Sequence, residues 1–406
     1  MIAYKFRVYP DQKQLEVLKQ FAGCVRFVYN YMLALSKERY EKEGIKWNTF
    51  EYKKLLPRLK EEYPFLKSAP SQALQQAVIN LGKAYENFFK GRAKFPKFKK
   101  KKHASSIYLP QGFKIEDRGK WLYLTIPKME KPLKVRKHRQ IEGIVKSITI
   151  TLSPFGKVYV SMLVEREVKP LERNGKVVAI DMGLKDFAVI VDSQGNIQKV
   201  SHPKYLLRTE KLLIRQQKKL SRKEKFSKNY QKQARKVAKL YEKVRNQRMD
   251  FLHKLSSAII HENQVVVVED LNTKGLLQNS RLSKAISDSG WAMFLTFLSY
   301  KAQLYGREVI FADRHSPSSK LCHVCGYKNT NLKLSEREWI CPVCGTKHDR
   351  DINAGLNLLR YGLAHLTGSR AGTVRTYACG DCSGGGMGLS PVYEPSVVEA
   401  GSSSFK

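Results

Sequence analysis

The spacing of hydrophobic residues divides the first part of the chain into a strand and a helical block. Residues 4–9 alternate with period two, which predicts a strand, and a Pro-Asp pair follows it. From there to about residue 90 the apolar positions recur every three or four residues, which predicts helices. Prolines are expected to divide this block into several helices, at Pro57, Pro64 and Pro70.

Short alternating runs between Gly, Pro and Asp turns predict a small β region over residues 107–168. The clearest runs are 121–126, 147–152 and 158–164. Because strand 4–9 precedes the helices and these strands follow them, we expect the helical block to be an insertion into one β-barrel.

The pattern changes again near residue 176, where a mixed α/β region with a central sheet is predicted. The apolar, β-branched run Val265–Val268 is typical of a buried central strand. The other expected strands are 176–180, 187–191, 197–200 and 308–312, and the expected helices are 205–262, interrupted near 221–228, and 291–305. From about Gly368 the chain is rich in Gly and Ser, so we expect a disordered tail.

Composition indicates a folded protein with a polyanionic partner. The chain has 406 residues, of which 42% are hydrophobic and 10% aromatic, enough for several packed modules and too many for wholesale disorder. Lys and Arg number 74 against 36 Asp and Glu, a net charge of +38, so nucleic acid is the first expectation. An anionic membrane surface is the weaker alternative. No long apolar run and no signal-peptide pattern occur, which favours a cytosolic protein without a membrane partner.

Two basic segments are candidate nucleic-acid contacts. Residues 90–103 hold eight Lys or Arg and no acid, with Phe95 and Phe98 among them. A solvated linker remains the alternative, although the interleaved aromatics favour nucleic acid. The second segment is the basic helical hairpin around residues 215–236. The candidate contacts are Lys94, Lys97, Lys99, Arg215, Lys218, Lys219 and Arg222.

Two Cys-x-x-Cys-Gly knuckles predict one structural zinc ion. Cys322 and Cys325 form the first, Cys341 and Cys344 the second, with fifteen residues between. Each turn directs two thiolates to one point, and four thiolates close a tetrahedron without an open position for substrate.

Other Cys and His residues near the knuckles are left out of this zinc site. His323 lies inside a knuckle and His348 would be a fifth ligand. Cys379 and Cys382 form a Cys-x-x-Cys without a second pair, in the Gly- and Ser-rich tail, and are expected to bind no metal.

Three acidic residues stand where buried elements end or begin. Asp181 follows strand 176–180, Glu269 follows Val265–Val268, and Asp351 opens an apparent helix. If these acids converge at one sheet edge, they repel one another unless a cation intervenes, and hard oxygen ligands suit Mg²⁺. Two such ions would support phosphodiester hydrolysis. Pattern alone leaves the neighbouring Asp349 open as an alternative to Asp351, although it is also placed to cap that helix.

The order of these motifs resembles the transposon-encoded TnpB family, kin of the compact type V CRISPR nucleases. The matching segments are Ile180–Lys185, Asn246–Ser256, Val268–Asn272, the two knuckles and His348–Asn357. The start Phe6–Pro10, the segment Phe95–Lys99 and the tail Glu399–Ser402 also resemble family members, so the resemblance covers essentially the whole chain.

This resemblance implies an RNA-guided DNA endonuclease with a RuvC-like, RNase H-fold core, in which Asp181, Glu269 and Asp351 bind two Mg²⁺ ions. It selects Asp351 over Asp349. It implies a guide RNA transcribed from the transposon end and cleavage of paired double-stranded DNA beside a short transposon-associated motif. Gln75 is a further candidate, for contact with an adenine edge, although a solvated helix position is the better reading.

The resemblance also implies a domain order. It comprises a β-barrel wedge domain (1–10 and 104–172), a helical recognition lobe with its basic linker (11–103), a RuvC-like core with the basic hairpin (173–314), a zinc ribbon (315–347), the last RuvC-like helix (348–367) and a flexible tail (368–406). Two alternatives are a guide-directed DNA-binding repressor without cleavage and a zinc-ribbon accessory factor of transposition.

Overall fold

A seven-stranded antiparallel sheet forms the first unit of the computed structural model, which describes residues 1–101, 105–153, 156–225, 227–313, 318–333 and 336–368. Its strands are β1 (Ile2–Tyr9), β2 (Ser105–Leu109), β3 (Lys114–Arg118), β4 (Trp121–Thr125), β5 (Leu133–Arg136), β6 (Ile144–Leu152) and β7 (Val158–Glu165). They are ordered β2-β6-β7-β1-β5-β4-β3. β1 pairs with β5 and β7 and therefore joins strands from much later in the chain.

The predicted barrel is an open sheet among the described residues, because β2 and β3 lie at its two edges and no pairing recorded there joins them. Local alternation predicts strands, whereas closure depends on tilt and stagger that no short segment specifies. The sequence analysis also missed β3 and β5, which are short and mostly polar on their exposed face.

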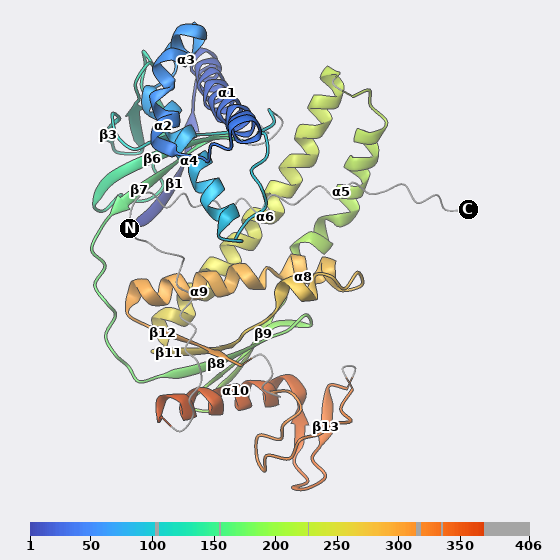
Figure 1. Cartoon of the computed structure of the whole chain (residues 1–406). Helices are drawn as coiled ribbons and strands as arrows, with labels where there is room; N and C mark the ends of the chain where they lie inside the picture. The colour runs from blue at the N-terminus through green and yellow to red at the C-terminus, as the bar shows by residue number, and fades with distance from the viewer. Residues whose placement is uncertain (102–104, 154–155, 226, 314–317, 334–335, 369–406) are drawn as a thin grey trace.

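Helices inserted between β1 and β2 cover one face of this sheet (Figure 1). They are α1 (Gln12–Glu43), α2 (Thr49–Lys54), α3 (Leu56–Glu62), the 3₁₀ helix η1 (Pro64–Ser68) and α4 (Ser71–Phe89). Tyr4, Phe6 and Val8 of β1 share one core with buried residues of α1 and α4. The predicted role of the prolines is confirmed, since Pro57 and Pro64 lie in the first turns of α3 and η1 and Pro70 directly precedes α4.

The second unit is a five-stranded mixed sheet with helices on both faces. Its strands are β8 (Val177–Met182), β9 (Asp186–Asp192), β10 (Ile197–Ser201), β11 (Val265–Glu269) and β12 (Glu308–Ala312), in the order β10-β9-β8-β11-β12. β11 lies in parallel between β8 and β12, so the prediction of a buried central strand is confirmed.

Figure 1 shows α9 and α10 on opposite sides of this sheet. The helices are α5 (Tyr205–Ser221), α6 (Lys228–Glu262), α7 (Thr273–Leu276), α8 (Ser283–Ser289), α9 (Trp291–Tyr305) and α10 (Arg350–Leu366). Even-numbered residues of β8 and β11 pack with α6 and α9, and odd-numbered ones with α10. Strand alternation thus assigns each side chain to one layer.

Close packing of α10 on the sheet depends on two glycines one heptad apart. A Cβ atom at Gly355 would lie 2.7 Å from Cγ2 of Val191, and one at Gly362 would lie 2.2 Å from Cγ2 of Val267. Only glycine allows the helix to come so near.

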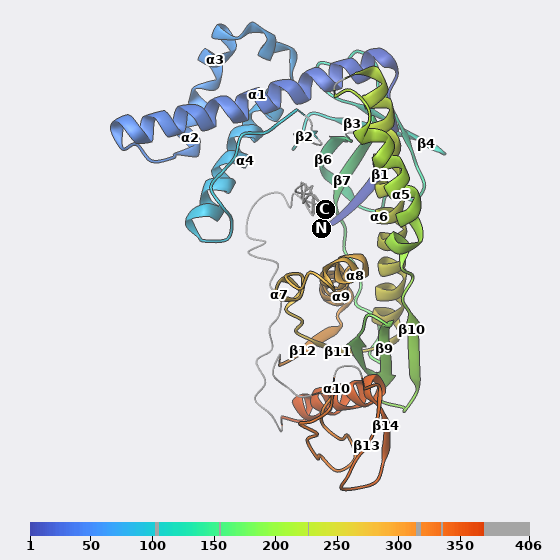
Figure 2. The same cartoon turned by 90° about the vertical axis from the view of Figure 1, so that its right-hand side faces the viewer.

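Between β12 and α10 the chain forms a small ribbon with the antiparallel strands β13 (Glu338–Ile340) and β14 (Lys347–Asp349). Figure 2 shows this ribbon at the opposite end of the molecule from α1–α3.

The hairpin of α5 and α6 connects the two units. Glu242 of α6 accepts hydrogen bonds from Lys157 Nζ (2.6 Å) and the Tyr159 hydroxyl (2.8 Å) at β7. The interruption predicted near residues 221–228 is confirmed as the turn between these two helices. None of the helices described here is long and apolar enough to cross a membrane. The tail predicted to be disordered lies almost entirely outside the described residues.

Candidate metal centres and nucleic-acid interface

The three candidate acids come together on the α10 side of the mixed sheet. Asp181 and Glu269 follow Ile180 and Val268, which are partners in the parallel pairing of β8 with β11. Their odd numbers place both acids on the face that α10 covers, and Asp351 is the second residue of α10. Burial, followed by the charges of Glu269 and Asp351, raises the pKa of Asp181 well above its ordinary value.

This electrostatic arrangement suits a divalent cation. Neighbouring carboxylates in a partly buried site raise one another's pKa values until a proton or a cation compensates them. Three carboxylates offer the hard oxygen ligands that Mg²⁺ prefers, but their oxygens are not gathered within 4.8 Å of one another as the cysteine sulfurs of the ribbon are.

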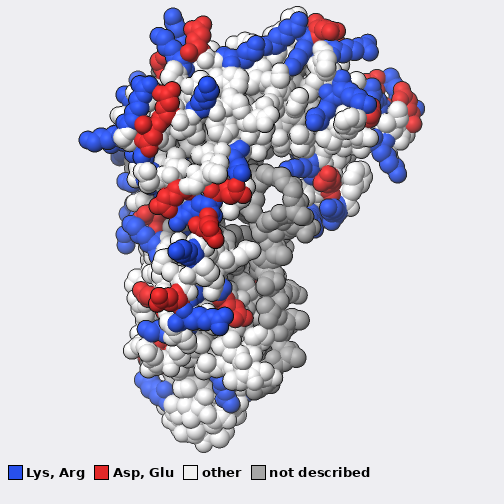
Figure 3. Space-filling model, turned by 90° about the vertical axis from the view of Figure 1, so that its left-hand side faces the viewer, with Lys and Arg blue, Asp and Glu red and all other residues white. Residues whose placement is uncertain are grey.

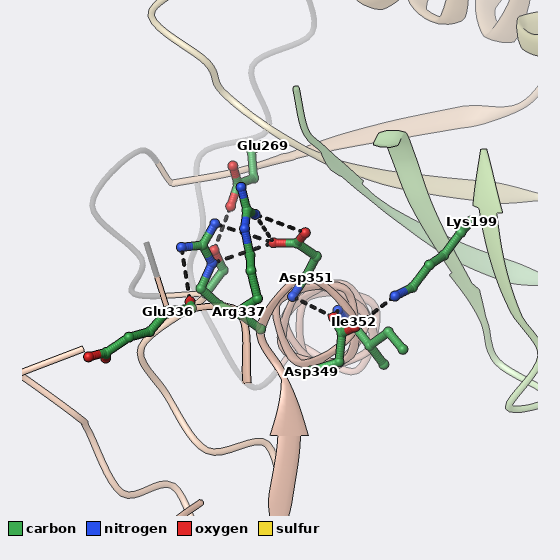
Figure 4. Close-up of polar contacts among 9 residues, drawn as sticks. Lys199, Glu269, Glu336, Arg337, Asp349, Asp351 and Ile352 are labelled. Atoms are coloured by element: carbon green, nitrogen blue, oxygen red, sulfur yellow. Dashed lines mark hydrogen bonds and ion pairs between the residues drawn. The ribbon is translucent and has the colours of Figure 1, made fainter. Parts of the chain in front are cut away.

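Polar side chains from the ribbon and from the first turn of α10 contact two of the three acids (Figure 4). Arg337 Nη1 lies 3.2 and 3.1 Å from the two Asp351 oxygens, and Arg350 Nε lies 3.4 Å from one of them. The Ser318 hydroxyl donates a 2.5 Å hydrogen bond to Glu269 Oε1. The sequence analysis missed Ser318 and Arg337, because nothing in their local sequence marks them as neighbours of the acids.

Asp349 has a different environment from Asp351. Its Oδ1 accepts hydrogen bonds from the backbone N–H groups of Asp351 (3.0 Å) and Ile352 (3.1 Å), so its predicted role as a helix cap is confirmed. Burial opposes ionisation of Asp349, but the hydrogen bonds from Lys199 and Ile352 outweigh it and lower the pKa. In Figure 4, Asp349 points towards Lys199, and Glu269 lies on the other side of Asp351.

A pocket of about 230 Å³ lies beside Glu269. Glu269 and Leu358 line it together with Asp270 and Asp313, which directly follow β11 and β12. Glu269 therefore borders open space, whereas Asp181 and Asp351 do not line this pocket.

The four predicted cysteines form one cluster in which all Sγ atoms lie within 4.8 Å of one another. Cys322 and Cys341 are buried, and the glycines after the knuckles, Gly326 and Gly345, have φ values of 79° and 68°. These positive φ values give the tight backbone that each knuckle needs, and the four thiolates fit a closed Zn²⁺ site. Cys379 and Cys382 lie outside the described residues.

The two histidines surround this cluster. His348 Nε2 lies 3.1 Å from Cys322 Sγ. His323 Nδ1 instead lies 3.0 Å from Asn353 Oδ1 on α10. His348 therefore contacts one of the four cysteines, whereas His323 contacts α10.

Basic side chains meet in a pocket of about 390 Å³ on the α5–α6 hairpin. Two predicted contacts, Lys219 and Arg222, line it, and the remaining lining residues are Lys223, Asn229, Lys232, Gln233 and Lys236. No acid lines this pocket. Arg215 and Lys218 are exposed elsewhere on α5.

The basic segment after α4 is attached to α1. The Asn30 side chain exchanges two hydrogen bonds with the Lys99 backbone, of 3.0 and 2.8 Å, and Lys99 Nζ lies 4.0 Å from the Tyr29 ring centre. Lys94 and Lys97 are exposed, as is Gln75 on α4. The structure therefore keeps this segment against a helix, with the Lys99 ammonium engaged by an aromatic ring.

The face of the seven-stranded sheet that points away from the inserted helices carries cations and aromatic rings that the sequence analysis missed, and α6 contacts it at Tyr159. Arg136 and Lys134 lie 5.0 and 4.3 Å from the Trp121 ring centre, and Tyr9 beside them is 51% exposed. One row in register crosses β3, β4, β5, β1, β7 and β6 and consists of Arg118, Trp121, Arg136, Arg7, Tyr159 and Thr151.

Such a face is suited to single-stranded nucleic acid, in which bases stack on rings and phosphates meet cations. Figure 3 shows Lys and Arg more densely over the upper part of the molecule than over its lower end. Period-two alternation within each strand could have indicated which side chains lie on this face. Their alignment in one row across the sheet depends on the strand register, which the sequence does not reveal.

Three family models match separate segments of the chain. A family described as "Probable transposase" matches residues 159–280, a "Cas12f1-like, TNB domain" matches residues 291–358, and a "Helix-turn-helix domain" matches residues 1–45. In this structure the last segment is β1 followed by the single helix α1.

Two curated relatives are similar over most of their length. A protein of Streptomyces pristinaespiralis, named "Putative RNA-guided DNA endonuclease", is 38% identical, and 89% of each chain is covered. "Putative RNA-guided DNA endonuclease InsQ" of Escherichia coli is 34% identical, over 90% of this chain and 93% of that protein.

Two solved structures share the fold. A Cas12f1–sgRNA–target DNA complex matches with a TM-score of 0.59 at 16% identity, covering 86% of this chain and 83% of that one. The mini-RNA-guided endonuclease CRISPR-Cas_phi3 matches with a TM-score of 0.53 at 11% identity, covering 88% and 92%.

Proposed function

This chain belongs to the TnpB family, and from that premise we propose that it is an RNA-guided DNA endonuclease that cuts guide-matched DNA beside a short transposon-associated motif. The observation that carries the proposal is the convergence of Asp181, Glu269 and Asp351 on one face of a buried sheet. The mixed sheet and α10 correspond in this proposal to a RuvC-like, RNase H-fold core.

The three acids would hold two Mg²⁺ ions. When bound, such a pair activates the attacking water and stabilises the leaving oxygen of the phosphodiester. Arg337 and Arg350 place positive charge beside Asp351, where the anionic phosphate approaches. The ribbon cysteines would hold one Zn²⁺ ion with a structural role.

The basic surfaces support binding of a guide RNA from the transposon end and of its target DNA. In such a complex base pairing selects the sequence, and the protein contacts backbone and shape. The hairpin pocket offers five cations to phosphates, and the cation–aromatic face around Trp121 offers stacking positions to unpaired bases. The first sheet and its helical insertion would serve as the wedge domain and recognition lobe.

The test is co-purification of the protein with RNA from its flanking DNA, followed by cleavage of matched plasmids in Mg²⁺ or EDTA. Asp181→Ala, Glu269→Ala and Asp351→Ala are each expected to abolish cleavage, because they remove metal ligands, and to leave RNA affinity within about twofold, because the basic surface is intact. Asp349→Asn is the matched control, since asparagine also caps helices, and it should keep cleaving.

Full cleavage by the three alanine variants would contradict the assignment. Specific RNA and DNA binding by the unmodified protein without any cleavage would instead identify a guide-directed repressor.

A further inference from the structure

The ribbon is attached to α10 by two buried asparagines that follow Asp351. Asn353 Nδ2 donates to the Leu321 carbonyl (2.7 Å), and Asn357 Nδ2 donates to the Ser318 (2.8 Å) and Leu321 (2.6 Å) carbonyls. Asn353 and Asn357 are 1% and 8% exposed. Buried amides that bind backbone carbonyls hold a segment in one position, because breaking these bonds leaves unpaired polar groups.

The segment held in this way includes Ser318, whose hydroxyl donates to Glu269 at 2.5 Å. Ser318 is 9% exposed, so solvent does not readily replace its bond. A hydrogen bond from a hydroxyl to an ionised carboxylate is charge-assisted and stronger than one between neutral groups. It restrains the orientation of the Glu269 carboxylate through Oε1.

The far side of the ribbon is attached to the same helix. The backbone N–H of Arg350 donates to the Arg337 carbonyl at 2.8 Å, and Glu338 of β13 is the strand partner of Asp349. The first cysteine of the cluster, Cys322, directly follows Leu321. Folding of a four-thiolate ribbon is coupled to its zinc, so the zinc-bound ribbon is what presents Ser318 to Glu269.

We propose that Ser318 is a positioning residue for the Glu269 carboxylate, held in place by the zinc-bound ribbon through Asn353 and Asn357. The inference rests on the proposed function, because it takes Glu269 to be a ligand of a divalent cation. In this proposal the ribbon contributes to the nuclease site, because its Ser318 hydroxyl donates a hydrogen bond to a ligand of the metal.

The experiment measures divalent-cation binding separately from cleavage. Guide-loaded protein without DNA is titrated with Mn²⁺ by electron paramagnetic resonance, zinc per chain is measured by atomic absorption, and the Mg²⁺ concentration for half-maximal cleavage is determined. Ser318→Ala is expected to weaken Mn²⁺ binding and to raise that Mg²⁺ concentration about 10-fold or more, because loss of an outer-shell partner typically costs this much. The zinc content should stay close to the unmodified value.

Three further variants separate positioning from folding. Ser318→Thr keeps the hydroxyl and should restore Mn²⁺ affinity, and Ser319→Ala removes a neighbouring hydroxyl and should change nothing. Asn353→Ala should weaken Mn²⁺ binding in the same direction as Ser318→Ala while zinc is retained.

Unchanged Mn²⁺ affinity and Mg²⁺ dependence in Ser318→Ala would overturn the inference, and so would failure of Ser318→Thr to restore them. Asp181→Ala serves as the reference for the proposed function. If the unmodified protein binds no more Mn²⁺ than Asp181→Ala does, the three acids are not a metal centre and both proposals are wrong. If Asp181→Ala loses Mn²⁺ binding but Ser318→Ala binds Mn²⁺ as well as the unmodified protein, the proposed function stands and only the positioning role of Ser318 is wrong.

Discussion

Two glycines show that the effect of a residue on stability depends on the atoms packed around it. Gly362 on α10 and Gly23 on α1 both lie inside helices, where glycine normally costs stability relative to alanine. Their environments differ, since a Cβ atom at Gly362 would meet Val267 at 2.2 Å and one at Gly23 would meet nothing within 4 Å.

Alanine substitutions at these two positions are therefore expected to have opposite effects. Gly23→Ala should raise the free energy of unfolding by about 0.5–1 kcal/mol, because it removes backbone entropy from the unfolded chain. Gly362→Ala should lower it by about 1–3 kcal/mol, because α10 must move off the sheet. Urea unfolding followed by circular dichroism measures both, and equal shifts of the same sign would contradict the packing argument.

At the scale of elements, α9 is joined to α6 by a buried lysine. Lys301 Nζ donates to the His253 carbonyl (2.7 Å) and to the hydroxyls of Ser256 (2.7 Å) and Ser257 (2.8 Å). The His253 ring stacks on Phe297 with 4.0 Å between ring centres. Burial, followed by the charge of Lys301, lowers the pKa of His253 to about 4.

This lowered pKa makes the α6–α9 contact sensitive to acid. The unfolded chain binds a proton at His253 near pH 6.5 and the folded chain only near pH 4, so this residue's contribution to stability falls as the pH decreases through that window. After allowance for partial exposure, the loss is roughly 1–2 kcal/mol.

His253→Phe keeps a stacking ring but cannot be protonated. The difference in melting temperature between this variant and the unmodified protein should therefore grow in favour of the variant from pH 7 to pH 4. A difference that stays constant over this range would contradict the titration of His253.

The ribbon is an element whose fold depends on its metal ligands. Cys322→Ser should release zinc and lower the melting temperature, because the buried Cys322 thiolate cannot be replaced by a hydroxyl of similar affinity. Cys24→Ser, at a buried cysteine of α1 outside the ribbon, is the matched control and should keep one zinc ion per chain. Metal analysis after dialysis distinguishes them, and zinc retained by Cys322→Ser would show that this cysteine is not a ligand.

At the scale of the whole molecule, the net charge of +38 favours binding of polyanions, and we expect particular surfaces to make most of the phosphate contacts. The hairpin pocket holds five cations, whereas Lys13 and Lys19 are exposed on α1 outside it. Binding to a polyanion releases counterions, so its salt dependence counts the phosphates that the protein contacts.

Charge reversal in this pocket should weaken guide RNA binding and reduce its salt dependence. For Lys219→Glu with Lys232→Glu, the slope of log affinity against log salt concentration should become shallower by about 1.5, since each lost phosphate contact removes about 0.7–0.9. Filter binding at several salt concentrations measures it. Lys13→Glu with Lys19→Glu makes the same change in net charge, and an equal effect from this control would show that the pocket is not a specific contact.

Much of this molecule could be predicted from short segments of sequence. The strands around Val177 and Val265 and the helix Trp291–Tyr305 follow from periodicities that the local chain carries by itself. The cysteine cluster follows from two turns whose thiolates are a few residues apart, and the cap formed by Asp349 follows from its place before a helix.

Only the tertiary structure decided which distant side chains meet. Ser318 contacts Glu269 across 49 positions of sequence, and the row through Trp121 and Arg7 exists only because β4, β5 and β1 pair in one register. The sequence by itself thus determined the elements and the local metal-binding turns, because their interactions span a few residues. The tertiary structure decided the surroundings of the acids and the cation–aromatic face, because side-chain contacts between remote segments depend on packing and register that no local pattern encodes.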